Sequence, residues 1–282
     1  MGRTLLLTSL ALVAFAANSL LCRVALSEEA IDPVAFTAIR LVSGAVALAP
    51  LFWRAPSSGA GESRARGTFD GLAAAALLVY AFAFSLAYVS LDAGVGALLL
   101  FGSVQVTMLV HGYRTGERMG PVQIGGAVLA AAGLVTQVFP GLTAPDPKGA
   151  SLMCLSGAAW GVYSLRGRGG RDPFAATARN FLAAAPVALL ALVVAGAEFG
   201  APRGIWLAVA SGAVTSGMGY VVWYLALPRL SATVASLVQL AVPPLAAVGG
   251  MLVLGEVLTA RFTLAAVMIL GGIAAAVTSR PR

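Results

Sequence analysis

The sequence is poor in the side chains on which soluble enzymes depend. Only 10% of its 282 residues are charged, and it has one histidine and two cysteines, Cys22 and Cys154. Neither cysteine belongs to a CxxC or Cys/His pattern, so we interpret both as packing residues and expect neither a metal nor another cofactor. The sequence also has no HExxH or GxSxG motif, which disfavours an enzyme.

What remains is largely apolar. Hydrophobic residues make up 59% of the chain, and the mean hydropathy of +0.91 lies far outside the range of soluble globular domains. A helix needs roughly 20 apolar residues to cross a bilayer. Apolar runs bounded by charges or by Pro and Gly predict helices over residues 4–24, 33–53, 70–89, 93–112, 121–139, 149–167, 173–195, 204–226, 232–254 and 260–279. The sequence therefore predicts an all-α integral membrane protein of ten transmembrane helices.

An internal repeat divides these helices into two sets of five. Three pairs of segments match: residues 32–38 with 172–178, Gly116-Glu117 with Gly255-Glu256, and residues 14–20 with 159–165. We therefore expect residues 1–140 to form a first five-helix repeat and residues 148–282 a second. Because five is odd, the second repeat must enter the membrane from the opposite side, and such inverted repeats are typical of transporters.

The net charge of +7 reflects topology, so we expect no nucleic-acid partner. With the N-terminus inside, the segments on the cytoplasmic side hold twelve of the eighteen Lys and Arg residues, the outer segments hold four, and Arg40 and Arg179 lie inside helices. Cytoplasmic loops collect positive charge. This pattern predicts that both termini are cytoplasmic, in the inner membrane of a bacterial-type cell.

Five features in order resemble the EamA-type ten-helix branch of the drug/metabolite transporter superfamily. They are Arg40 after the Asp32-Pro33 helix start, the two Gly-Glu turns, Ala159-Trp160, and the run from Ala235-Ser236 to Pro243-Pro244. The resemblance implies a central cavity lined mainly by helices one, three, four, six, eight and nine. It is nearest to bacterial amino-acid exporters, including those for aromatic amino acids. One departure is Val104-Gln105, where the family often has a proline.

Polar and aromatic side chains inside the predicted helices are the candidates for binding a solute. Polar groups in a bilayer are costly and often functional, although hydrogen bonds between helices are the alternative explanation. Aromatic rings offer flat surfaces to an apolar solute, and Trp223 is one more such ring. The predicted substrate-binding residues are Asn18, Tyr80, Phe101, Gln105, Trp160, Tyr163, Tyr220 and Gln239.

The two arginines inside helices have two interpretations. We interpret Arg40 and Arg179 as snorkelling toward an interface, with pairing to carbonyls or to a substrate carboxylate as the alternative. Pro186, Pro243 and Pro244 interrupt predicted helices and are expected to act as flex points during alternating access.

The predicted function is export of neutral or aromatic amino acids. All eleven Asp and Glu residues fall at the ends of predicted helices or in loops. No buried carboxylate is therefore available at the midplane to couple a proton or sodium ion, and we expect a facilitator. A drug, vitamin or nucleotide precursor is the alternative cargo, and a scaffold or receptor that does not transport is the alternative of another class. The expected partners are a small-molecule substrate and lipid, with a monomer favoured over a dimer.

Overall fold

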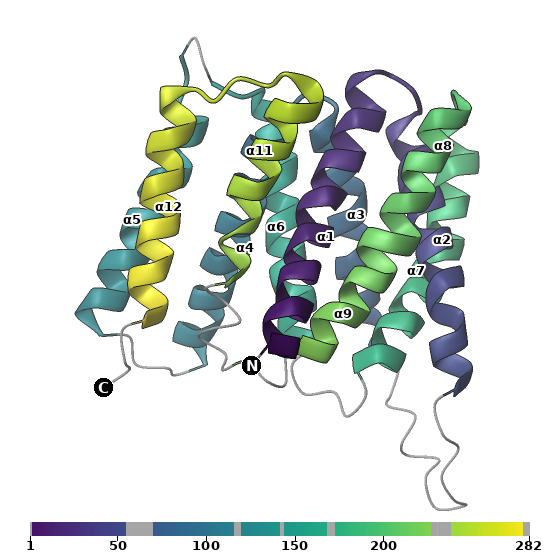
Figure 1. Cartoon of the computed structure of the whole chain (residues 1–282), viewed down its shortest axis with the longest axis horizontal. Helices are drawn as coiled ribbons and strands as arrows, with labels where there is room; N and C mark the ends of the chain where they lie inside the picture. Colours follow the sequence, from purple (N-terminus) through teal and green to yellow (C-terminus); the bar gives the residue numbers. More distant parts are fainter. Residues whose placement is uncertain are drawn as a thin grey trace, which may run out of the picture.

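The computed structural model describes residues 2–54, 70–115, 120–141, 144–167, 173–226, 230 and 238–278, and no strand occurs among them. The helices stand side by side in one elongated bundle, and the start of α1 and the end of α12 lie at the same end of it (Figure 1). The helices are α1 (Gly2–Ser27), α2 (Pro33–Arg54), α3 (Gly71–Tyr88), α4 (Ala93–Arg114), α5 (Pro121–Val138), α6 (Pro147–Gly167), α7 (Pro173–Ala195), α8 (Pro202–Val209), η1 (Ala210–Met218), α9 (Gly219–Ala226), α11 (Val242–Leu254) and α12 (Ala260–Thr278).

These elements confirm the predicted all-α membrane fold of ten helices. Within the described residues, seven spans are long and apolar enough to cross a membrane, and one of them is the continuous segment Pro202–Ala226 made of α8, η1 and α9. Large apolar side chains cover the outside, such as Leu252 at 80% and Val194 at 78% exposure. A surface of this kind requires lipid or a partner to cover it.

Three helices of the first half pack against their equivalents in the second half, and the other two pack against each other's equivalents. α5 packs on α12, α2 packs on α7 and α4 packs on α11. α3 packs on α6, which is the equivalent of α1. α1 packs on the segment of α8, η1 and α9, which is the equivalent of α3. At the α5–α12 crossing, a Cβ on Gly126 would lie 2.8 Å from the backbone N of Ala276, and one on Gly272 would lie 2.7 Å from the backbone N of Ala130. This reciprocal contact is what an inverted repeat requires.

Two helices differ from the prediction. α11 begins at Val242, so Pro243 and Pro244 lie in its first turn and do not interrupt a helix. A proline costs little there because its missing N–H would have had no partner. The predicted start of this helix falls on residues 231–237, outside the described residues. Pro186 does lie inside α7. The eighth helix contains the π-helical segment η1, which periodicity alone did not predict.

Candidate functional site

A small cavity lies between the helices of the bundle. It is lined by Phe15, Asn18, Ser19, Tyr80, Phe84, Leu100, Phe101, Trp160, Thr215, Ser216 and Tyr220. These residues come from α1, α3, α4, α6, η1 and α9, which are helices one, three, four, six and eight of the predicted order. The ninth helix, α11, contributes no described residue to this lining. The cavity thus lies between the two repeats, where transporters bind their solutes.

The polar wall of the cavity is built by α1 and η1. The Asn18 Oδ1 atom accepts hydrogen bonds from the Ser211 hydroxyl at 2.7 Å, the Thr215 hydroxyl at 3.1 Å and the Ser216 hydroxyl at 3.4 Å. Thr215 and Ser216 follow Ser211 by four and five positions. The wider turn of a π-helix places residues with these spacings on one face. The π-helical segment therefore aims three hydroxyl groups at one side chain, and such segments recur at functional sites.

The remainder of the lining is largely aromatic. The Trp160 ring lies 4.8 Å from the Tyr80 ring and 5.0 Å from the Tyr220 ring, measured between centroids, and Phe84 lies 5.5 Å from Tyr80. Phe15 meets Tyr220 edge-on at 6.0 Å. These separations fall in the range in which aromatic rings attract one another. The rings thus form a continuous surface on which a flat apolar solute could stack.

Arg40 on α2 adjoins this cavity and is only 2% exposed. Its Nε donates to the Ser216 hydroxyl at 3.2 Å and its Nη2 to the Tyr80 hydroxyl at 2.8 Å. Its Cζ lies 5.1 Å from the Tyr80 ring centroid and 4.9 Å from that of Phe84. The snorkelling interpretation is therefore wrong for Arg40, because α2 is buried here between α3, α7 and η1.

The structure brings together five of the eight predicted binding residues. Asn18, Tyr80, Phe101, Trp160 and Tyr220 line the central cavity. Gln105 is buried on α4, one turn beyond Phe101, but lies outside this lining, and Gln239 is half-buried just before α11 and also outside it. Trp223 packs edge-on against Phe15 at 5.9 Å. Phe101 and Gln105 are four residues apart and so share a face of α4, but only Phe101 lines the cavity.

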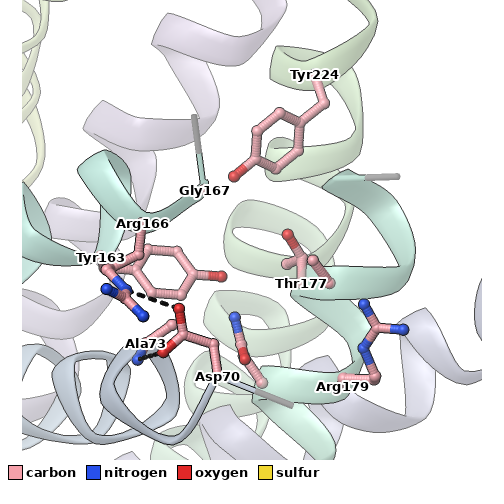
Figure 2. A pocket seen from close by; sticks show the side chains of 10 residues that line it. Asp70, Ala73, Tyr163, Arg166, Gly167, Thr177, Arg179 and Tyr224 are labelled. Carbon is pink, nitrogen blue, oxygen red and sulfur yellow. Dashed lines mark hydrogen bonds and ion pairs between the residues drawn. The ribbon is translucent and has the colours of Figure 1, made fainter. Parts of the chain in front are cut away.

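Tyr163 lines a second pocket, of ≈ 50 Å³, near the end of the bundle that carries the termini. Figure 2 shows its hydroxyl pointing between Asp70 and Thr177. The Arg166 Nε lies 2.7 Å from an Asp70 carboxylate oxygen, and this pairing lowers the pKa of Asp70. Arg179 also lines this pocket, so the two arginines inside helices lie in different surroundings.

The opposite end of the bundle carries a wider cavity of ≈ 300 Å³, which Asp92, Asp146 and Glu256 help to line. The Arg23 Nε atom lies 3.3 Å from the Glu256 Oε1 atom, and the Arg23 Nη2 atom lies 3.6 Å from the Asp92 Oδ1 atom. Glu256 is half-buried, and this desolvation raises its pKa despite the hydrogen bond from the Ala93 N–H and the charge of Arg23. Every acidic residue that the structure describes lies outside the helices.

The polar residues of η1 are not among the predicted binding residues. Ser211, Thr215 and Ser216 stand in an apolar run of small residues, where serine and threonine commonly satisfy their own helix backbone. Only the π-helical spacing turns them toward Asn18. The depth of Arg40 was missed for a similar reason, because the sequence does not show which helices cover α2.

Known proteins match this chain over nearly its whole length. The model of the EamA-like transporter family matches residues 2–139 and again residues 147–278. An uncharacterised protein of Pseudomonas aeruginosa is 55% identical over 275 residues, which are 96% of this chain and 93% of that protein. A solved crystal structure aligns with a TM-score of 0.64 at 21% identity, over 96% of this chain and 98% of the other. That likeness concerns the fold alone.

Proposed function

Since this chain belongs to the EamA-like transporter family and is a multi-pass membrane transporter, we propose that it exports neutral and aromatic amino acids through the central cavity. The observation that carries this proposal is the cavity's pairing of an aromatic wall with a polar one. Trp160, Tyr80 and Tyr220 form the first wall, and Asn18 with the η1 hydroxyls forms the second. An amino acid needs both kinds of surface.

We propose alternating access because the cavity is too small for a solute in this conformation. Its volume of ≈ 20 Å³ is about that needed for one water molecule, so a solute requires the two repeats to separate. We propose that residues 1–140 and 148–282 rock against each other around this site, with Pro186 in α7 and Pro243 and Pro244 at the start of α11 as flex points. The packing of α2 on α7, α4 on α11 and α5 on α12 across the two halves supports such a motion.

We further propose that transport is downhill and needs no ion. The described carboxylates lie at the helix ends, and transporters usually place coupling groups near the bilayer midplane. The proposed setting is a bacterial inner membrane with both termini in the cytoplasm, where positively charged loops favour that side. A monomer contains every residue of the cavity. Solute accumulation driven by an imposed pH or sodium gradient across proteoliposomes would refute the facilitator.

The proposal is tested by uptake into proteoliposomes that contain the purified protein. A panel of radiolabelled amino acids is supplied outside, together with a nucleoside and a vitamin as alternative cargoes. Saturable flux is expected for phenylalanine, tyrosine and leucine, and weaker flux for lysine, which would bring a second cation beside Arg40. Saturable flux confined to the nucleoside or the vitamin would reject the amino-acid assignment, and no saturable flux of any solute would favour a scaffold or receptor.

A further inference from the structure

Arg40 is a buried cation that has no counter-ion among the residues that the structure describes. It lies inside α2 with 2% of its surface exposed, and the described ion pairs involve other arginines, namely Arg23, Arg166 and Arg203. The described acidic residues all lie outside the helices. A buried charge is costly unless an opposite charge and hydrogen bonds compensate it. The described part of the chain supplies the hydrogen bonds but not the opposite charge.

Only some of the N–H donors of the Arg40 guanidinium have hydrogen-bond partners among the described residues. Its Nε and Nη2 atoms donate to Ser216 and Tyr80, and its face lies over the Tyr80 and Phe84 rings. Its Nη1 atom is buried and has no hydrogen-bond partner among the described residues. A guanidinium has five N–H donors, and the two on Nη1 thus remain available.

The neighbours of Arg40 connect it to the central cavity. Tyr80, Phe84 and Ser216 each contact the guanidinium and each line the cavity. Close packing fixes the position of α2, because a Cβ on Gly212 of η1 would lie 2.8 Å from the backbone C of Arg40. The Ser216 hydroxyl in turn donates to the Asn18 Oδ1 atom at 3.4 Å. Arg40 itself is not a lining residue, and its positive charge lies directly behind the wall at which a solute would bind.

We propose that Arg40 is the anchor for the carboxylate of the transported solute. The planar guanidinium matches a carboxylate with two parallel N–H···O bonds, and the aromatic wall then receives the solute's side chain. This assignment rests on the proposed function, because it places the solute in the central cavity. It adds that the solute must carry an anionic group, so that the carboxylate supplies the charge which the described helices lack.

The wild-type protein tests this proposal without any variant. Binding of L-phenylalanine, L-phenylalaninamide and phenethylamine to the purified protein is compared by isothermal titration calorimetry, with phenylacetate and phenylacetamide as a second pair. The carboxylates are expected to bind roughly ten- to a hundredfold more tightly than the matched amides, as for loss of a hydrogen bond to a charged group. Equal affinities within each pair would overturn the proposal.

Variants of Arg40 then test whether this residue causes the preference for the acid over the amide. Arg40→Met is expected to abolish the preference for acid over amide, and Arg40→Lys to keep a part of it, since lysine retains the charge but not the fork. Arg179→Met is the matched control, because it removes the other arginine inside a helix, and its acid-to-amide ratio is expected to equal that of the wild type. An unchanged ratio in a folded Arg40→Met protein would contradict the anchor.

The two proposals can fail separately. Saturable binding of phenylalanine and its amide with equal affinity leaves the proposed function standing and overturns the carboxylate anchor. Binding of phenylacetate but of no amino acid rejects the amino-acid assignment and supports the anchor. Binding of none of the five compounds contradicts both. If Arg40→Met does not fold, the ligand pairs on the wild-type protein still decide the question.

Discussion

Glu256 of the second repeat binds Arg23 of the first, with 3.3 Å between the Glu256 Oε1 and Arg23 Nε atoms. The same carboxylate accepts a hydrogen bond from the Ala93 N–H at 2.9 Å, where α4 begins. Arg23 also donates to the backbone oxygens of Tyr88 and Val89. One residue pair thus ties α1, the α3–α4 connection and the end of α11 together, at the end of the bundle opposite the termini (Figure 1).

Removal of the Glu256 carboxylate is expected to destabilise the protein. Glu256→Ala loses both the bond to Arg23 and the acceptor for the Ala93 N–H, and we expect a loss of about 1–3 kcal/mol in the free energy of unfolding. Glu256→Gln keeps an acceptor oxygen and is expected to lose less. Urea unfolding in detergent measures both. The control is Glu198→Gln, an exposed position, where a change above about 0.5 kcal/mol would be unexpected. Equal stability of Glu256→Ala and wild type would contradict the role of this pair.

The raised pKa of Glu256 predicts a pH dependence of this end of the bundle. Burial favours the protonated carboxyl more strongly than Arg23 and the Ala93 N–H favour the charged one. The half-buried arrangement is therefore most stable below the ordinary carboxyl pKa, and it loses stability as pH rises through the raised value. Opening that exposes Glu256 to water should become easier over the same pH interval.

Cysteine labelling measures this opening. Val95 lines the wide cavity beside Glu256, so Val95→Cys is introduced into a variant in which Cys22 and Cys154 are replaced by alanine. Its labelling rate, corrected for the thiolate fraction, is expected to rise with pH across the titration of Glu256. In Glu256→Gln the corrected rate should be flat. A rate that falls with rising pH, or a slope that survives in Glu256→Gln, would contradict the prediction.

Adjacent glycines on α5 should respond in opposite ways to alanine. A Cβ on Gly126 would meet the backbone of α12, 2.8 Å from the Ala276 N, whereas a Cβ on Gly125 would have no neighbour within 4 Å. Gly126→Ala is therefore expected to destabilise the protein by about 1–3 kcal/mol through overpacking. Gly125→Ala should stabilise it by up to about 1 kcal/mol through its better helix propensity. Thermal unfolding in detergent distinguishes the two, and identical shifts would contradict the close α5–α12 crossing.

The sequence could predict what depends on helix length and repetition. Asp32 accepts from the Val34 N–H at 2.7 Å, as its predicted place before a helix that begins with proline requires. Trp160 and Tyr80 lie in the cavity as proposed. The sequence could not predict which face of a helix turns inward when the helix is apolar all round. Gln105 shares a helix face with Phe101 by spacing, and yet only Phe101 lines the cavity.

Local backbone geometry accounts for the rest. Residues 204–226 read as one regular apolar helix, but the π-helical segment Ala210–Met218 changes which residues share a face. That change brings Thr215 and Ser216 to the cavity. The depth of Arg40 depends on how closely Gly212 lets η1 approach α2, and such a contact is a property of tertiary packing.

Two tryptophans provide the most direct test of whether the central cavity binds the solute. Trp160 lines the cavity, while Trp206 is 71% exposed on α8. The saturable uptake of radiolabelled phenylalanine into proteoliposomes is measured for the wild type, Trp160→Ala and Trp206→Ala at equal protein content. We predict about a tenfold or greater loss of uptake efficiency for Trp160→Ala, as expected for the loss of aromatic packing, and wild-type uptake for Trp206→Ala. Unaltered uptake by Trp160→Ala, or equal losses in both variants, would contradict a central cavity that binds the solute.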